Sequence, residues 1–381
     1  MARYVFKRKY KRAIIGVADF FGYLIFKPLK FIAGFFIKES GIKKILVMRI
    51  DQIGDVIQTI PFFEKLAAKY PDSEIHALTA KPPKFLLDNN IHIKKVFTIA
   101  SSWFYKGNKE EKNDFFTVMG ALKKEKYDLA FDLRGDIRNI LFLYFAGAKK
   151  ICGYGCAGGG FLLDCNVEYN REDHEIDKNL KLIDEQPIKE GLKLDFYVPD
   201  KDKREVDSLF AENCVNPKNK ILTVHPFTLR KSKLWGFEKY DELIQNLVKE
   251  YENAKIFVIG SQEDKKFEDE FAWPENAVNA IGRTSMAGTI EIIKRSDIYI
   301  GNDSGPQYFA AYSGIKTMVI YGSSTDYRRW LPKVKRENFI AMSKDIECKN
   351  CELAECSKKS HECMDMITVE EVFDKLKGWM K

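Results

Sequence analysis

The segment Lys44–Leu66 reads KILVMRIDQIGDVIQTIPFFEKL and combines the two patterns that decide the fold. Its first seven residues, Lys44–Ile50, form an apolar run that is typical of a strand buried on both faces of a parallel sheet. A turn containing Gly54 follows, and the apolar spacing after it predicts a helix from about Val56 to Lys69. A strand that leads through a glycine turn into a helix is the repeating unit of an α/β fold.

The same alternation of apolar runs and helical segments recurs in both halves of the chain. Further strands are expected at 75–80, 128–133, 220–226, 255–260, 297–302 and 317–322, and helices at 203–213, 239–251 and 286–295. Strands alternating with helices predict two α/β domains, each built on a parallel sheet. The polar stretch 200–219 is the expected boundary, which gives domains of 43–205 and 206–381.

The composition is that of a globular protein with a substantial core. Of the 381 residues, 45% are hydrophobic and 13% aromatic, which excludes a disordered or collagen-like chain. Eight cysteines are too few for a disulfide scaffold, and the N-terminus has no pattern of a cleavable signal peptide. We therefore expect a protein of the cytoplasm.

Positive charge is concentrated at the N-terminus. Residues 1–44 hold eleven Lys or Arg and two Asp or Glu, a net charge of +9, so the other 337 residues carry −2 of the total of +7. A body so close to neutral argues against a general nucleic-acid-binding surface.

The basic leader contains an amphipathic segment, IIGVADFFGYLIFKPLKFIAGFFI at 14–37. Its apolar seam has helical spacing and comprises Phe20, Phe21, Leu24, Ile25, Pro28, Leu29, Phe31, Ile32, Phe35 and Phe36. The polar side comprises Asp19, Lys27, Lys30 and Lys38. We expect residues 1–42 to lie on an anionic membrane surface, which makes the protein peripheral to the cytoplasmic face of the inner membrane. Packing of the helix on its own domain stays open. A membrane-spanning helix also stays open, although two central lysines and Pro28 disfavour it.

The turn after the first strand places carboxylates where α/β folds bind ligands, beyond the carboxyl ends of the strands. Asp55 follows Gly54 and could accept a proton from a bound hydroxyl group. It could equally cap the helix that begins there, and Asp51 has the same two possible roles.

Two loops in the second half are suited to a diphosphate. VHPFTLRKSKLWG at 224–236 follows a strand and supplies hydroxyl and cationic groups, including Thr228 and Lys233. NDSGPQYFAA at 302–311 also follows a strand, and its Asp303, Ser304 and Gly305 precede a helix whose first N–H groups could face a phosphate. Helix capping is the alternative role of Asp303.

The order of these segments resembles glycosyltransferase family nine, the heptosyltransferases of lipopolysaccharide core assembly. The resemblance extends from about Lys43 to the C-terminus. It rests on RIDQIGDVIQTIP at 49–61, Lys233 with Trp235, NDSGPQYFAA, VIYGSS at 319–324 and ECMDMITVEEV at 362–372.

This resemblance implies a GT-B fold, in which two Rossmann-like domains have parallel sheets that face a cleft. The N-terminal domain would bind a lipid-linked saccharide acceptor and the C-terminal domain a nucleotide sugar, usually ADP-heptose. It further implies inverting transfer without a metal or other cofactor.

The site residues of the family match positions in this chain. Asp55 matches the catalytic base, and Lys233 matches the lysine that contacts the donor phosphates. Asp303, Ser304 and Gly305 match the donor-binding turn, and Thr228 is a further donor-binding candidate. Arg134 and Arg138, in DLRGDIRN at 132–139, are candidates for binding the acceptor, with simple surface solvation as the alternative.

Two features leave alternatives open. Tyr308 stands where the family usually has a histidine, so a protein that binds a nucleotide sugar without transferring it, or a transferase for another nucleotide sugar, remains possible. The C-terminal cysteines could bind zinc, stay as thiols or form disulfides; they are Cys348, Cys351, Cys356 and Cys363.

Overall fold

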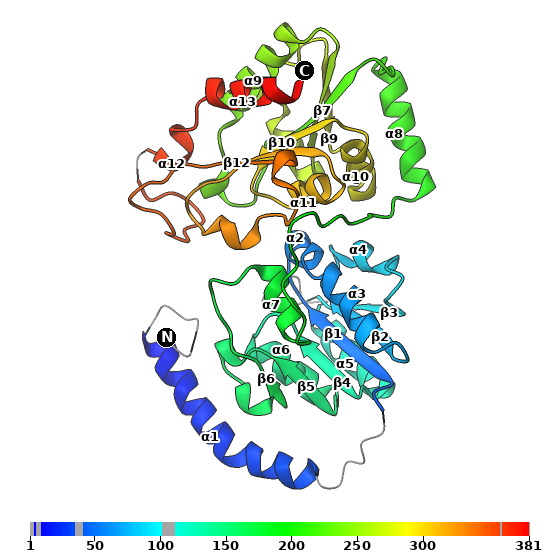
Figure 1. Ribbon diagram of the computed structural model, residues 1–381, viewed down its shortest axis with the longest axis vertical. Helices are drawn as coiled ribbons and strands as arrows, with labels where there is room; N and C mark the ends of the chain where they lie inside the picture. Colours follow the sequence, from blue (N-terminus) through cyan, green and yellow to red (C-terminus); the bar gives the residue numbers. More distant parts are fainter. Residues whose placement is uncertain (1–3, 5–8, 35–40, 101–110, 359, 381) are drawn as a thin grey trace. The chain divides into compact units, whose positions relative to one another are not determined.

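The computed structural model of the chain describes residues 4, 9–34, 41–100, 111–358 and 360–380. It divides into two compact units, Met1–Pro187 and Ile188–Lys381. Each unit holds one six-stranded sheet whose strands all run parallel, with helices on its faces (Figure 1). The expectation of two α/β domains with parallel sheets is confirmed.

The sheet of the first unit has the strand order β3-β2-β1-β4-β5-β6, so the chain starts in the middle and winds to both edges. Its strands are β1 (Lys44–Arg49), β2 (Glu74–Thr79), β3 (Lys95–Thr98), β4 (Leu129–Asp132), β5 (Lys150–Gly153) and β6 (Cys165–Asn166). Its helices after residue 41 are α2 (Ile53–Ile57), α3 (Ile60–Lys69), α4 (Lys84–Asp88), α5 (Glu111–Glu125), α6 (Ile137–Phe145) and α7 (Glu175–Lys181), with single 3₁₀ turns η1 (Gly155–Ala157) and η2 (Gly160–Leu162). Because β1 is central, both of its faces are buried, as its apolar run predicts.

The helix expected from Val56 to Lys69 is broken in two. Helix α2 ends at Ile57 and α3 begins at Ile60. Between them the Thr59 hydroxyl donates a hydrogen bond to the Val56 carbonyl at 2.6 Å, and Pro61 has no N–H to continue the helical ladder. The break leaves α2 as a short helix directly after β1.

The sheet of the second unit has the order β12-β11-β10-β7-β8-β9. Its strands are β7 (Lys220–His225), β8 (Ala254–Gly260), β9 (Ala277–Ile281), β10 (Ile298–Asn302), β11 (Lys316–Ile320) and β12 (Phe339–Met342). Its helices are α8 (Asp200–Glu212), α9 (Phe237–Glu250), α10 (Met286–Lys294), α11 (Pro306–Tyr312), α12 (Glu362–Asp365) and α13 (Val369–Met380), with 3₁₀ segments η3 (Lys231–Lys233), η4 (Gln262–Glu270), η5 (Tyr327–Trp330) and η6 (Arg336–Asn338). The C-terminal helix packs on α9, and its buried side chains belong to the core of this unit.

The division between the units falls after Pro187, earlier than the expected boundary after residue 205. The segment that follows is already bound to the second unit through backbone hydrogen bonds. The N–H groups of Gly191 and Leu192 both donate to the Lys333 carbonyl, at 3.0 and 2.8 Å, and the Leu194 N–H donates to Tyr312 at 3.0 Å. Polar composition alone could not reveal these long-range contacts.

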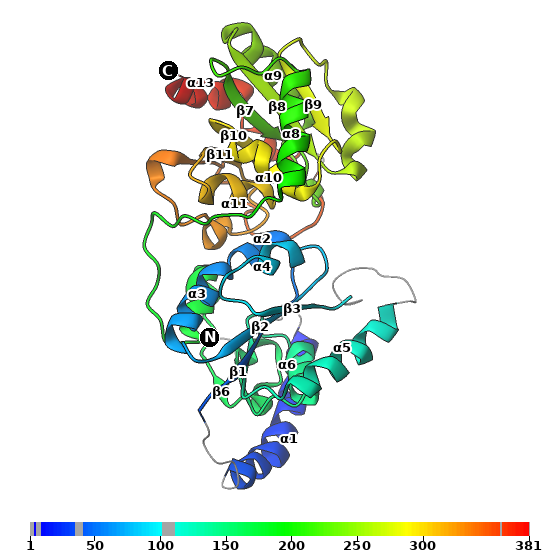
Figure 2. The ribbon, with the colours of Figure 1, turned by 90° about the vertical axis from the view of Figure 1, so that its right-hand side faces the viewer.

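Helix α1 (Lys9–Gly34) packs on the first unit near η2, beside α6 and β6 (Figures 1 and 2). Asp19, on the polar side of the predicted helix, is buried against the body of the unit, as in the alternative that packs the helix on its own domain. The start of the apolar seam, from Phe20 to Ile25, is instead exposed at four positions. The side chains from Leu29 onward in the seam, with Lys30 and Lys38, lie outside the described residues. Among the helices that the structure describes, none has the length and hydropathy needed to cross a membrane.

Candidate active site

Asp55 lies in α2, just beyond the carboxyl end of β1. The helix begins at Ile53 with Gln52 as its N-cap, so the role of a cap does not fall to Asp55. Its side chain is 23% exposed, which leaves it accessible to a ligand. Burial, and then the neighbouring Asp51 carboxylate, raise the pKa of Asp55 to about 8, while Arg49 opposes this shift. A carboxylate that titrates near neutral pH is suited to accept a proton.

The buried Arg49 at the end of β1 holds this carboxylate group in place. Its guanidinium nitrogens lie 3.5 Å from Asp55 Oδ1, 3.3 Å from Asp51 Oδ2 and 3.0 Å from Glu175 Oε1. It also donates to the Leu133 carbonyl at 2.7 Å. The arginine therefore fixes the end of β1 against the end of β4 and against α7.

Glu175, the first residue of α7, completes the network. Burial would raise its pKa, but Arg49 and Lys178 outweigh burial and lower the pKa of Glu175 to about 2. Lys178 Nζ lies 2.6 Å from Glu175 Oε2. Glu175 is thus a permanent anion that competes with Asp55 for Arg49, and sequence reasoning did not identify it, Arg49 or Lys178.

Arg134 reaches the same cluster from the end of β4. Its Nη1 lies 3.0 Å from Asp51 Oδ1 and donates to the Ile50 carbonyl at 3.2 Å. The turn that presents it is organised by the fully buried Asp132, whose carboxylate accepts the N–H groups of Arg134 at 3.2 Å and Gly135 at 2.9 Å. Burial raises the pKa of Asp132 to about 6. Arg134 therefore lies in the same cluster as Asp55, and Asp51 is the carboxylate that it contacts.

Arg138 has a more local setting. It sits in the first turn of α6, where Asp136 is the N-cap. Its Nε donates to Asp136 Oδ1 at 2.8 Å, and its side chain is 48% exposed. Arg138 is accessible at the carboxyl edge of the sheet, two residues after the cap that orients it.

In the second unit, Lys233 and Asp303 meet although 70 residues separate them in sequence. Lys233 Nζ lies 2.5 Å from Asp303 Oδ2, and both side chains are mostly buried. The other oxygen, Oδ1, accepts a hydrogen bond from Gln307 Nε2 at 3.0 Å. Asp303 therefore does not cap α11, whose N-cap is Gly305. The pair places one cation and one carboxylate at the carboxyl ends of β7 and β10.

Ser304 and Gly305 continue the turn after β10. Ser304 Oγ lies 3.0 Å from Nδ1 of His225, the last residue of β7. Burial lowers the pKa of His225 to about 4, so this histidine is neutral at pH 7 and Nδ1 can accept the serine hydroxyl proton. Thr228 lies three residues farther along the β7 loop, half-buried, and its hydroxyl accepts the Arg230 N–H at 3.5 Å.

Tyr308 is part of the core of the second unit. Its ring is buried and stacks on Tyr312, and its hydroxyl donates to the Trp330 carbonyl at 3.0 Å. The tyrosine thus ties α11 to η5, a structural contact within this unit.

The C-terminal segment that carries the four cysteines supports the loop that presents Lys233. Ser232 donates to the Ala354 carbonyl from its N–H at 3.0 Å and to the Leu353 carbonyl from its hydroxyl at 2.7 Å. Its own carbonyl lies 3.2 Å from His361 Nε2. All four cysteines of this segment are free thiols in the structure.

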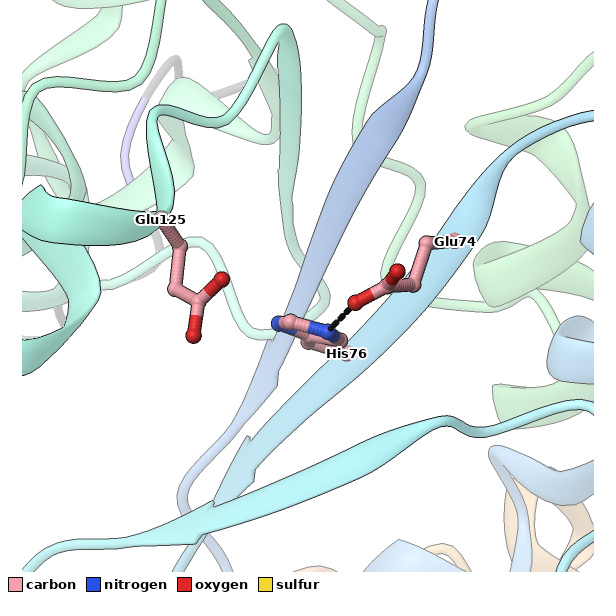
Figure 3. A group of neighbouring side chains, drawn as sticks. All are labelled: Glu74, His76 and Glu125. Carbon is pink, nitrogen blue, oxygen red and sulfur yellow. Dashed lines mark hydrogen bonds and ion pairs between the residues drawn. The ribbon is translucent and has the colours of Figure 1, made fainter.

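Glu74, His76 and Glu125 form a group whose ligand atoms come within 4.8 Å of one another (Figure 3). Among the described residues, no other group of His, Cys, Asp or Glu converges in this way. Lys44 and Lys95 lie 2.6 and 3.0 Å from the two oxygens of Glu125 and already neutralise it. The group lies at the starts of β1, β2 and β3, opposite the carboxyl edge where such folds bind ligands, and its contacts are those of a structural ion-pair network.

Comparison with known proteins gives this arrangement a family context. The family model described as glycosyltransferase family 9 (heptosyltransferase) matches residues 116–361. The lipopolysaccharide heptosyltransferase 1 of Campylobacter coli is 22% identical over 303 residues, which cover 75% of this chain and 85% of the relative. The lipooligosaccharide heptosyltransferase 2 of Campylobacter jejuni is 26% identical over 271 residues, which cover 68% of this chain and 78% of the relative.

Among solved structures, the E. coli ADP-heptose lipopolysaccharide heptosyltransferase II superposes with a TM-score of 0.68 at 18% identity. The match covers 88% of this chain and 98% of that one. The two parallel sheets are therefore those of a GT-B fold.

Proposed function

Since the chain belongs to glycosyltransferase family 9, we propose that it transfers heptose from ADP-heptose to a sugar hydroxyl of a lipopolysaccharide-core acceptor, with inversion at the anomeric carbon. ADP-heptose stands in the name of the E. coli heptosyltransferase that shares the fold. The Campylobacter relatives are named lipopolysaccharide heptosyltransferase 1 and lipooligosaccharide heptosyltransferase 2, so they support the class of acceptor.

The observation that carries the proposal is the Asp55 carboxylate, which combines partial exposure with a pKa raised to about 8. In the proposed reaction, Asp55 takes the proton from the acceptor hydroxyl as the oxygen attacks the anomeric carbon of the donor. The bond from that carbon to the diphosphate oxygen breaks on the opposite face, and ADP leaves. A base in this role contributes roughly 10²–10⁴-fold to the rate.

The donor diphosphate would be held by the second unit. Lys233 is a cation that now pairs with Asp303, and on binding it would exchange this partner for a phosphate oxygen. Ser304, with its hydroxyl set by neutral His225, and Gly305 would line the same anion, and Thr228 offers another hydroxyl on the β7 loop. Stabilising the leaving diphosphate lowers the barrier because negative charge develops there in the transition state.

The acceptor would be held by the first unit. Arg134 and Arg138 lie at the carboxyl edge of its sheet, and both keep part of their guanidinium groups exposed. Arginine is the preferred partner of phosphate, so both side chains would suit an acceptor that carries phosphate groups. Arg134 also contacts Asp51, so acceptor phosphate that draws it away would lessen the neutralisation of the carboxylate cluster around Asp55.

The test is a transfer assay with purified protein, ADP-heptose and core lipopolysaccharide truncated before each heptose in turn. We expect ADP release with one acceptor and a product heavier by one heptose, whose anomeric configuration by NMR is opposite to that of the donor. Asp55→Ala should lower kcat by about 10²–10⁴-fold. Asp88→Asn, an exposed carboxylate on α4, is the matched control and should be unaffected.

The same assay decides between this function and its alternatives. Binding of ADP-heptose without turnover on any acceptor would indicate a nucleotide-sugar-binding protein, and turnover only with another nucleotide sugar would change the donor. The absence of the usual histidine at Tyr308 motivated the first alternative. In the structure, the Tyr308 hydroxyl donates to the Trp330 carbonyl, and the transfer assay decides whether turnover occurs without a histidine there.

A lipid-linked acceptor also requires access to a membrane. We expect residues 1–42, with their excess of basic side chains, to hold the protein at the cytoplasmic face of an anionic membrane as a peripheral protein. An enzyme held there meets its acceptor by diffusion in two dimensions.

A further inference from the structure

Helix α1 has two different sides, and one of them is docked on the first unit. The docked side follows a spacing of three or four residues and comprises Ile15, Asp19, Gly22, Tyr23 and Phe26. Asp19 is the anchor: Oδ1 accepts the Gly159 N–H at 2.8 Å, and Oδ2 accepts the Tyr4 hydroxyl, also at 2.8 Å. The carboxylate is buried, so both bonds are shielded from water.

The docking is close enough to require a glycine. A Cβ placed on Gly22 would lie 2.4 Å from the Phe161 ring of η2, far inside contact distance. After this glycine, Tyr23 and Phe26 pack on Phe161, with centroid distances of 6.2 and 5.4 Å, and Phe26 also meets Tyr144 of α6 at 6.2 Å. Helix α1 therefore has one defined position on the unit.

The opposite side of α1 is a continuous apolar surface. We call it the outer face, and it comprises Ile14, Val17, Phe20, Phe21, Leu24 and Ile25, each more than half exposed. On the body of the unit, Phe145 at the end of α6 is 57% exposed, and its ring contacts Tyr144, which in turn meets Phe26 of α1. Single exposed apolar residues are ordinary, but a stripe of this size marks an interaction surface.

We propose that the outer face of α1 and Phe145 lie together in an anionic lipid surface. In this arrangement, which we call the rigid plate, the contacts of Asp19 and Gly22 hold α1 in a fixed position on the acceptor-binding unit. Lipid is the partner that fits, because residues 1–44 carry a net charge of +9 and a second copy of the same segment would be repelled. This inference rests on the proposed function, to which it adds a fixed orientation of the acceptor unit on the membrane. A flexible leader would supply attachment alone.

The first experiment measures attachment by co-sedimentation of the full chain with vesicles. We expect binding to vesicles with 30% phosphatidylglycerol, binding at least tenfold weaker to pure phosphatidylcholine, and a loss of at least tenfold in the double variant Phe21→Ser/Leu24→Ser. The matched control is Ile91→Ser, which removes an exposed apolar side chain beside β3, at the opposite edge of the sheet from β6. Wild-type binding by the double variant would overturn the proposal. The proposal would also be overturned if the wild-type chain did not bind vesicles but formed a dimer that the double variant cannot form. The outer face would then bind a second copy of the chain.

The second experiment measures orientation. Phe145→Trp should be quenched by brominated lipids in the vesicles, at least twofold more than Ile91→Trp, with the unsubstituted chain as the background for its five native tryptophans. Adding Gly22→Leu should undock α1, because the leucine meets Phe161, while the helix itself is stabilised. Vesicle binding should then stay within about threefold of wild type, and quenching of Trp at 145 should fall to that at 91.

Asp19→Ala, which removes both anchoring bonds without adding bulk, should act in the same direction if Gly22→Leu does not fold. If quenching of Trp at position 145 stayed unchanged in a folded variant with α1 undocked, the proposed fixed orientation would be wrong. Neither experiment depends on turnover, so failure of the proposed heptosyl transfer would leave these results intact and would be seen separately in the transfer assay.

Discussion

Replacing Asp55 by Asn should remove catalysis and stabilise the first unit in the same step. The carboxylate lies within a cluster in which Asp51 and Glu175 share Arg49 with it. Its pKa of about 8, against an ordinary 3.8, means that the folded protein prefers Asp55 protonated. Asparagine keeps the shape of the side chain and removes the charge that the fold disfavours.

The magnitude follows from the same pKa difference. It corresponds to at most about 6 kcal/mol at about 1.4 kcal/mol per unit. About 2 kcal/mol, a third of that upper bound, is enough for the difference to be measured. Between pH 4 and pH 8 the folded state binds a proton that the unfolded state has released, so the stability of the wild type falls with rising pH. The advantage of Asp55→Asn should therefore be absent at pH 4, grow up to about pH 8 and stay constant above it.

Thermal unfolding at a series of pH values measures this advantage, and about 2 kcal/mol should raise Tm by about 4–8 °C at pH 8. Transfer assays on the same samples should show a wild-type kcat that rises to a plateau above about pH 8, and a variant that is lower by about 10²–10⁴-fold. Asp88→Asn should change neither quantity. Near-normal turnover of Asp55→Asn at pH 8.5 would refute the assignment of the base, and a Tm difference that does not grow with pH would refute the argument from the pKa.

Three further predictions concern the other parts of the molecule. Glu175→Gln should shift the midpoint of the pH–kcat profile to lower pH, because a nearby anion is lost and Arg49 is freed for Asp55. An unchanged midpoint would show that Glu175 does not influence the pKa of the base. Lys233→Ala should weaken ADP binding by about 10–100-fold in calorimetric titration, since a charged hydrogen bond contributes about 1.5–3 kcal/mol, whereas Tyr308→Phe should leave ADP affinity unchanged. Membranes carrying the full chain should release at least part of it in high salt or alkaline carbonate, and a chain that starts at Gly41 should stay in the supernatant; complete retention after carbonate would indicate a spanning helix.

Sequence patterns identified the central strands of each sheet and missed the outer ones, which are β3, β5 and β6 in the first sheet and β9 and β12 in the second. Strands β1, β7 and β10 are continuous apolar runs because helices cover both of their faces. Strand β6 has only two residues, and β5 and β12 are as short as β4 but, unlike β4, are not buried at all four positions. The positions of the candidate site residues were also predictable from the sequence, because Asp55, Lys233 and Asp303 each closely follow a strand along the chain.

What the sequence by itself determined is therefore what depends on neighbours along the chain: the parallel α/β class, the turns after the central strands and the apolar seam of the leader. Only the tertiary structure decided the partners of the charged groups. Arg49 meets Glu175 across 126 residues, and Asp19 turns inward to Gly159 across 140. Periodicity reports which side of a helix is apolar but not which side is docked, and a pKa depends on charges that come together only when distant segments fold onto one another.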